Sequence, residues 1–162
     1  SEMCIRDSSQ TEDLIPLIDD TLRAAGVDRR EVTEVVVGVG PGPFTGLRVG
    51  IVTGVMLAEG LGIPVYGVHS LDACAGVVVA DGSMQGEFNV SIDAKRGEVF
   101  WARYTADGTR IAGPFVGKDV DALPGVMSAA ALAVSTERVP PRPVYLREPD
   151  ATIPGAPKKV TP

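Results

Sequence analysis

A glycine- and proline-rich loop at residues 41–43 is the part of the sequence best suited to chemistry. The β-branched run at 35–40 before it indicates a strand buried on both faces, because its apolar residues do not alternate with polar ones. The apolar stretch at 45–61 after it predicts a buried helix, with Thr45 as its cap. Since the amino end of a helix attracts anions, a loop in this position suggests phosphate binding.

The loop nevertheless departs from both common nucleotide-binding fingerprints. In the dinucleotide pattern Gly-x-Gly-x-x-Gly, the third glycine would fall at Pro43. In a Walker A loop a glycine is followed by Lys and then Ser or Thr, whereas Gly46 is followed by Leu47 and Arg48. We therefore do not expect this loop to bind a nucleotide on its own.

The sequence also lacks the side chains that a metal centre or a catalytic triad needs. His69 is the sole histidine, and Cys4 and Cys74 are the sole cysteines. Zinc sites and nucleophile–base pairs require several such residues in convergent positions. We therefore predict no catalytic residues and no metal ligands, and we expect His69 to be a half-buried residue at a strand end. Two cysteines suit a reducing cytosol better than a disulfide scaffold.

Small residues recur at every fourth position of the predicted helix at 45–61, which places them on one ridge: Gly46, Gly50, Gly54, Ala58 and Gly62. A glycine inside a helix costs about 1 kcal/mol relative to alanine, so this ridge indicates that something packs closely against it. Two alternatives stay open, a contact within the domain and a contact with another protein. Arg48 is expected to form a salt bridge in one of the same two settings.

Three stretches of the chain resemble the TsaB (YeaZ) family. Residues 40–50 read Gly-Pro-Gly-Pro-Phe-Thr-Gly-Leu-Arg-Val-Gly, similar to the family signature Gly-Pro-Gly-Ser-Phe-Thr-Gly-Leu-Arg-x-Gly, with Pro43 in place of the usual serine. Ile-Asp-Ala-Lys-Arg-Gly-Glu-Val-Phe-Trp-Ala at 92–102 and Pro-Val-Tyr-Leu-Arg at 143–147 agree with two further stretches. The resemblance covers most of residues 14–147. That family is the non-catalytic partner of TsaD in bacterial tRNA threonylcarbamoyladenosine synthesis.

The resemblance implies an α/β fold of the actin-like ATPase (ASKHA) type, in an incomplete, two-lobed version. The chain looks truncated at its start, because residues 1–7 do not resemble the family's first strand and hairpin, and shortened at 113–124. The expected units are a non-family end at 1–10, a first lobe at 11–86, a second lobe at 87–150 and an extended tail at 151–162.

Periodicity and turn residues predict the individual elements. Ser9 and Glu12 have capping-box spacing, and Gly26 is suited to a helix carboxyl end. The expected helices are 11–25, 45–61, 70–80 (capped by Ser70) and 127–138, and the expected strands are 35–40, 63–68, 88–92, 99–104, 110–112 and 144–147. The strand–helix–strand order at 35–68 predicts a parallel pair.

The resemblance also implies where the chain binds and what accompanies it. The family pairs with TsaD through its first two helices, so the expected interface residues are Leu14, Leu17, Ile18, Gly46, Arg48, Gly50, Gly54 and Ala58. An acidic residue near phosphate or Mg²⁺ in related ATPase-type folds corresponds to Asp93, so Gly42, Thr45 and Asp93 are the residues expected nearest to any phosphate. The alternative that we favour for Asp93 is capping of its own turn. No cofactor is expected on the chain alone, and ATP, ADP or metal only in a complex.

Composition limits the function classes. A formal net charge of −6 and an isoelectric point near 4.7 argue against direct nucleic-acid binding, which favours a basic surface. The apolar runs contain charges or prolines before they reach membrane-spanning length, so we expect a cytoplasmic protein without a membrane contact.

The function that the resemblance implies is a non-catalytic scaffold. It would dimerise with TsaD and, with the ATPase TsaE, support threonylcarbamoyl transfer to adenosine 37 of tRNA. Two alternatives remain: a glycoprotease-like or kinase-like enzyme of the same fold, and a self-associating homodimeric module.

Overall fold

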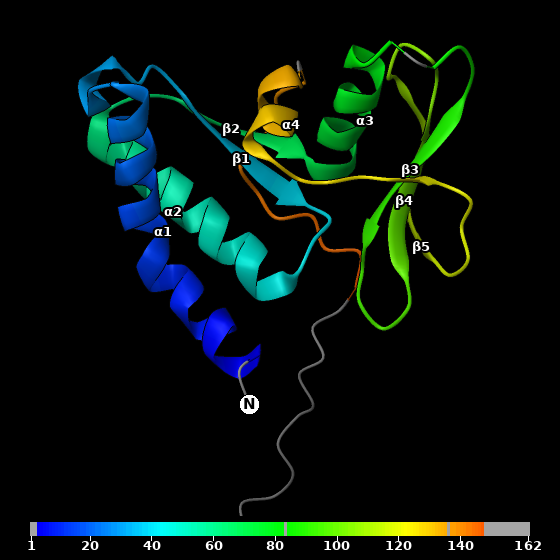
Figure 1. Ribbon diagram of the computed structural model, residues 1–162, viewed down its shortest axis with the longest axis horizontal. Helices are drawn as coiled ribbons and strands as arrows, with labels where there is room; N and C mark the ends of the chain where they lie inside the picture. Colours follow the sequence, from blue (N-terminus) through cyan, green and yellow to red (C-terminus); the bar gives the residue numbers. More distant parts are fainter. Residues whose placement is uncertain (1–2, 83, 136, 148–162) are drawn as a thin grey trace, which may run out of the picture.

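Two β-sheets of different size form the two halves of the computed structural model, which describes residues 3–82, 84–135 and 137–147. One sheet has two strands in the order β1-β2, and the other has four in the order β5-β4-β3-β6. Figure 1 shows the first sheet beside α1 and α2, and the second at the opposite end of the molecule. We refer to these halves as the first and the second lobe.

The first lobe is built on the predicted strand–helix–strand unit. β1 (Val35–Gly40) and β2 (Val65–His69) pair in parallel, with Val35 opposite Val65. The connecting helix α2 (Phe44–Leu61) packs against the strands and ends at Gly62, whose backbone is left-handed. The parallel pair is thereby confirmed.

Helix α1 (Met3–Ala25) corrects the prediction for the start of the chain. The helix runs through residues 3–10, which lie before the start that we predicted at residue 11, so Ser9 lies inside it and does not cap it. The segment 3–10 contains neither proline nor glycine, and nothing in it opposes a helix. The predicted end is confirmed, because Gly26 has φ +68° and Val27 N–H donates to Leu22 O at 3.0 Å. A short 3₁₀ turn, η1 (Arg29–Glu31), follows.

The second lobe contains the predicted hairpin. β3 (Phe88–Asp93) and β4 (Val99–Tyr104) are antiparallel, and β5 (Arg110–Gly117) adds a third strand longer than the expected 110–112. The short β6 (Leu123–Pro124) pairs with β3 in parallel.

Helix α3 (Ser70–Ala80) lies between the lobes and contacts strands of both sheets. Its inner face joins the second-lobe core through Leu71, Cys74 and Ala75, all at most 2% exposed. Helix α4 (Ala129–Val134) packs against α3 and the first sheet (Figure 1). The two helices thus cover the side of β1 and β2 opposite to α2.

Three boundaries differ from the sequence-based expectations. α2 begins at Phe44 with Pro43 at the cap position, so Thr45 does not cap it, and α3 has His69 rather than Ser70 at its cap position. α4 is shorter than the predicted 127–138, because Ser128 caps it through Ala131 N–H at 3.1 Å. Residues 144–147 form no strand: Val144 N–H donates to Val39 O of β1 at 2.7 Å, but the segment then leaves the sheet towards the second lobe.

Candidate partner interface and inter-lobe cleft

The two faces of α2 have different surroundings. Ile51, Gly54 and Ala58 are buried, and a Cβ built on Gly54 would lie 2.3 Å from Cγ1 of Val37 in β1. Close packing at this glycine is therefore made by the sheet of the same chain. The glycine spacing correctly indicated a close approach, and at Gly54 and Ala58 the structure places it within the domain.

The opposite face of α2 exposes large apolar side chains. Val52 is 60% and Met56 66% exposed. Both follow Arg48 at four-residue intervals, about 200° around the helix axis from the glycine ridge. The sequence analysis missed Val52 and Met56 as interface candidates because it assigned the glycine ridge to the partner.

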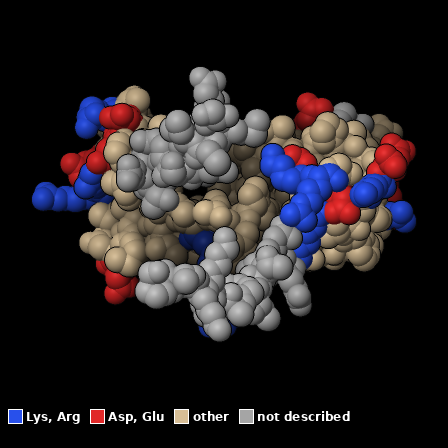
Figure 2. All heavy atoms as spheres, turned by 90° about the horizontal axis from the view of Figure 1, so that it is seen from below, with Lys and Arg blue, Asp and Glu red and all other residues tan. Residues whose placement is uncertain are grey.

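Helix α1 lies beside α2 (Figure 1) and exposes apolar side chains of its own. Leu17 is 61% and Ile15 47% exposed, whereas Leu14 and Ile18 are half-buried. We call the exposed side chains of Val52 and Met56 the outer apolar face; Ile15 and Leu17 lie about 200° apart around α1 and so point to different sides of that helix. In the view of Figure 2, charged side chains gather at the two ends of the molecule.

The remaining predicted interface residues lie near the start of α2. A Cβ on Gly50 would meet nothing within 4 Å, so the ridge reaches the sheet only in its second half. Gly46 is half-buried. The Arg48 guanidinium lies 5.1 Å from the ring centroid of Phe44, a cation–π contact within the chain, and a salt bridge from Arg48 to a partner stays a prediction.

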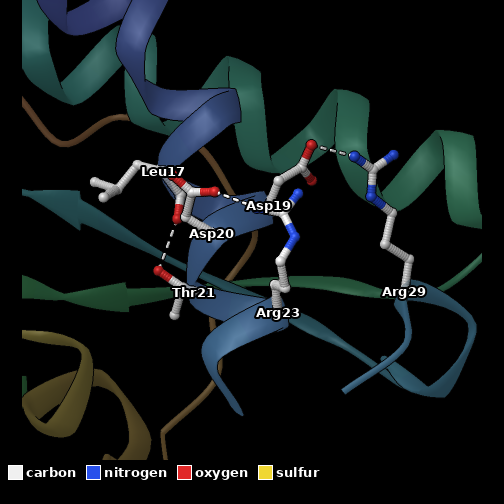
Figure 3. Close-up of polar contacts among 6 residues, drawn as sticks. All are labelled: Leu17, Asp19, Asp20, Thr21, Arg23 and Arg29. Carbon is white, nitrogen blue, oxygen red and sulfur yellow. Dashed lines mark hydrogen bonds and ion pairs between the residues drawn. The ribbon is translucent and has the colours of Figure 1, made fainter. Parts of the chain in front are cut away.

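Polar contacts gather near the end of α1 (Figure 3). Arg23 bonds Asp20 at 2.6 Å, and Arg29 forms an ion pair with Asp19 that ties η1 to α1 and raises the pKa of Arg29. Leu17 points away from the Asp19–Arg29 pair (Figure 3). The end of α1 is therefore a charged part of the surface.

The three stretches that carry the family resemblance converge at a cleft between the lobes. The cleft has a volume of about 260 Å³ and is lined by Gly42, Pro43, Phe44, Asp93, Ala94, Lys95, Arg96, Phe100, Tyr145, Leu146 and Arg147. Of the three residues predicted to lie nearest to phosphate, Gly42 and Asp93 meet here, and Thr45 is not among the lining residues. A mostly apolar crevice of about 270 Å³ shares Gly42, Pro43 and Asp93 with the cleft.

Asp93 caps its own turn, as the favoured alternative predicted. Its Oδ1 accepts a hydrogen bond from Lys95 N–H at 2.8 Å, and its Oδ2 lies 3.1 Å from Lys95 Nζ. These contacts with Lys95, the backbone bond first, hold the pKa of the exposed Asp93 carboxyl below its ordinary value. The carboxylate is thus engaged in the turn that forms one wall of the cleft.

A buried polar cluster in the second lobe was not predicted. Tyr104 is fully buried, and its hydroxyl donates to Asp72 Oδ1 at 2.7 Å. Arg110 Nη1 lies 3.4 Å from the same carboxylate oxygen. Burial, and then the adjacent Asp72 carboxylate, raise the pKa of Tyr104 far above its ordinary value. Tyr104 lies 32 positions from Asp72 in the sequence, and Arg110 lies farther still, so no local pattern could have revealed the cluster.

Metal-ligating residues do not gather anywhere in the described part of the chain. His69 ends β2 half-buried, as expected, and its Nδ1 is buried without a hydrogen-bond partner among the described residues. Among the described helices, α2 alone is long and apolar enough to cross a membrane, a weak indication because core helices of water-soluble proteins also satisfy it.

Comparison with known sequences identifies related proteins. The sequence model for TsaD, tRNA N6-adenosine threonylcarbamoyltransferase, matches residues 6–154. An uncharacterized protein of Mycobacterium leprae is 48% identical over 76% of this chain and 32% of its own length. The tRNA threonylcarbamoyladenosine biosynthesis protein TsaB of Escherichia coli is 36% identical over 65% of this chain and 45% of its own length. TsaB of Bacillus subtilis is 32% identical over 56% and 38%.

The matched region therefore spans about half the length of these relatives or less, from 32% to 45%. Among solved structures, YeaZ from Pseudomonas aeruginosa superimposes with a TM-score of 0.62 at 24% identity, covering 84% of each chain. A second Pseudomonas aeruginosa structure, of a protein with similarity to peptidase YeaZ, has a TM-score of 0.65 at 24% identity over 84% of this chain and 83% of that one. These likenesses and the mixed helix–sheet architecture are consistent with an actin-like ATPase fold. The chain belongs to the family that the TsaD model describes, on its TsaB (YeaZ) branch.

Proposed function

We propose that this chain is a non-catalytic scaffold in tRNA threonylcarbamoyladenosine biosynthesis, which pairs with a TsaD-type transferase through the outer apolar face. The observation that carries the proposal is the exposure of Val52 and Met56, at 60% and 66%, on a helix whose other face already packs on its own sheet. Exposed apolar groups of this size on neighbouring helices mark an interaction site. Helix-on-helix packing is the contact that such a surface accommodates.

The relatives named TsaB support the pathway, and the loop at residues 38–48 supports the non-catalytic role, since it matches neither nucleotide fingerprint. On this proposal ATP, ADP and metal enter only with the partners, TsaD and the ATPase TsaE, in the cytoplasm. The chain contacts no nucleic acid directly, in keeping with its net charge of −6. The competing enzyme hypothesis would require turnover by the purified chain alone.

Introduction of a negative charge into the outer apolar face tests the proposal. Met56→Asp should leave the free energy of unfolding within about 0.5 kcal/mol, because the side chain is exposed. The same change should weaken binding to a co-expressed bacterial TsaD by about 100-fold, since it buries an unpaired carboxylate in an apolar contact. Affinity and complex size would be measured by titration calorimetry and by size exclusion with light scattering.

Val77→Asp is the matched control, because it introduces the same charge at an apolar helix position that is 43% exposed on α3. Equal binding by the two variants would contradict the proposal. If the unmodified chain alone has the mass of a dimer that Met56→Asp dissociates, the outer apolar face instead belongs to a second copy of the chain.

A further inference from the structure

The segment formed by residues 144–147 crosses from the first lobe to the second and is anchored in both. Val144 N–H donates to Val39 O in β1 at 2.7 Å, and the Val144 side chain packs against the first-lobe core. Two residues later, Leu146 packs against the second-lobe core. Like α3, this segment connects the two lobes. It also borders the inter-lobe cleft.

Tyr145 fixes the segment to the start of α2. Its ring centroid lies 4.8 Å from that of Phe44, the first residue of the helix, with the rings tilted by 31°. Phe44 in turn lies under the Arg48 guanidinium. Aromatic pairs at this separation are attractive beyond simple burial. The position of Tyr145 and the direction of the first turn of α2 therefore depend on each other.

Arg147 fixes the other end of the segment to the turn between β3 and β4. Its Nη1 donates to Ala94 O at 2.9 Å, its guanidinium forms an ion pair with Glu98, and it lies 5.8 Å from the Phe100 ring centroid. In that turn Lys95 and Arg96 have φ of 63° and 61°, a left-handed conformation that costs non-glycine residues free energy. Such a turn persists only when surrounding contacts hold it, and Arg147 supplies three of them.

We propose that residues 144–147 act as a clasp that couples the first turn of α2 to the β3–β4 turn, with Arg147 as the positioning residue. Because α2 carries the outer apolar face, the clasp sets how this face is presented to the partner. That last step rests on the proposed function, whereas the coupling itself is a property of the chain alone. On this proposal, the contacts among the three stretches that resemble the TsaB family hold the two lobes in a fixed relative position.

Hydrogen exchange of single amides in the full chain tests the coupling. In Arg147→Ala, the amides of Ala94 and Glu98, which are bonded within the turn, should exchange roughly tenfold faster because the turn opens locally. The amides of Val144 and Leu47 should exchange faster as well, Leu47 N–H being the first to bond within α2. The amide of Gly62, bonded at the far end of the same helix, should not change.

Two further variants separate the clasp from general destabilisation. Arg142→Ala removes the same charge from an exposed position in the neighbouring segment and should change none of these rates. Arg147→Lys, which keeps the charge but loses the forked geometry, should give intermediate rates. If Arg147→Ala fails to fold, Glu98→Gln removes the ion pair while the bond to Ala94 O remains, and should give the same pattern with smaller changes. Faster exchange at Ala94 and Glu98 with unchanged rates at Val144 and Leu47 would overturn the clasp.

Affinity for TsaD decides the link to the partner. Arg147→Ala should bind about three- to tenfold more weakly, in proportion to the loosening of α2. Unchanged affinity for TsaD together with faster exchange at Leu47 would show that the clasp does not affect how the outer apolar face meets the partner. If Met56→Asp also leaves the affinity unchanged, the proposed interface itself fails, while the exchange rates still decide whether the clasp couples the lobes.

Discussion

The two lobes differ in where their apolar side chains are placed. In the second lobe, Phe88, Val90, Phe100, Ala102 and Tyr104 are at most 6% exposed, so the strands and α3 enclose their own core. In the first lobe, α2 buries three residues on the sheet and leaves Val52 and Met56 mostly exposed. The second lobe also exposes apolar side chains on its edge strand β5, with Ile111 at 46% and Phe115 at 45%, so what distinguishes the first lobe is the higher exposure of apolar side chains on a helix.

This difference follows from the size of the two sheets. An isolated two-stranded sheet is marginally stable in water, so β1 and β2 depend on helices packed against both faces. A helix held on a narrow sheet contacts it with one stripe, and an apolar helix then has a second stripe without a partner. The four-stranded sheet needs less cover, and a buried hydrogen bond from Tyr104, at the end of the inner strand β4, to Asp72 ties this sheet to α3.

The largest effect is expected on the inner face of α2. Gly54→Ala should lower the free energy of unfolding by about 1–3 kcal/mol, since overpacking forces neighbouring groups to move. The added Cβ would lie 2.3 Å from Cγ1 of Val37, a buried β-branched side chain with little freedom to rotate away. Urea denaturation of the isolated chain measures the change. An unaltered midpoint would show that α2 stands farther from β1 than the structure has it.

A comparable test in the second lobe is Tyr104→Phe. The loss of the hydroxyl removes the 2.7 Å hydrogen bond to Asp72 and should cost about 1.5 kcal/mol, the usual value for a bond to a charged group. Tyr145→Phe is the control, because it deletes a hydroxyl from a residue that is 41% exposed and should be neutral. Equal urea midpoints for the two variants would mean that the Tyr104–Asp72 hydrogen bond does not stabilise the second lobe.

Alkaline pH should also act through the second-lobe core. Burial raises the pKa of Cys74, 2% exposed, from 9.0 to about 11, and the pKa of Tyr104 is raised as well. The folded chain then holds more protons than the unfolded chain between the two pKa values, so stability is complete below pH 9.0 and falls as the pH rises towards 11. Unfolding midpoints measured across this range should decline less steeply in Cys74→Ala. Parallel slopes in the two proteins would contradict the assignment to Cys74.

Most of the fold could be predicted because its signals are local. The hairpin of β3 and β4 has alternating residues around a turn, and the parallel pair has two apolar runs around a long helix. The segment 144–147 was mistaken for a strand because its composition is strand-like. Its place is set by contacts far along the chain, the backbone bond from Val144 to Val39 and the side-chain bond from Arg147 to Ala94 O. Contacts between distant segments leave no periodic signal.

The candidate site was predictable only in part, for a physical reason that α2 illustrates. Four-residue spacing of glycines indicates close packing, and a neighbouring sheet or a partner helix can equally supply it. The structure assigns the second half of the ridge to β1, through Gly54 and Ala58. The partner-facing candidates Val52 and Met56 follow once that side is known, because they lie opposite.

The smallest effect, and the sharpest contrast with Gly54, is expected one turn earlier in the same helix. Gly50→Ala should raise the free energy of unfolding by up to about 1 kcal/mol, since alanine favours the helix and its Cβ would meet nothing within 4 Å. The same substitution four residues apart thus has opposite signs, which distinguishes burial against the sheet from helix propensity alone. Gly50→Leu extends the test to the partner. If TsaD contacts only the outer apolar face, this variant should bind with unchanged affinity; if it also uses the first half of the ridge, affinity should fall while the urea midpoint does not. A lower midpoint for both Gly50 variants would mean that the first half of the ridge is packed within the domain too, and that the open part of α2 is confined to Val52 and Met56.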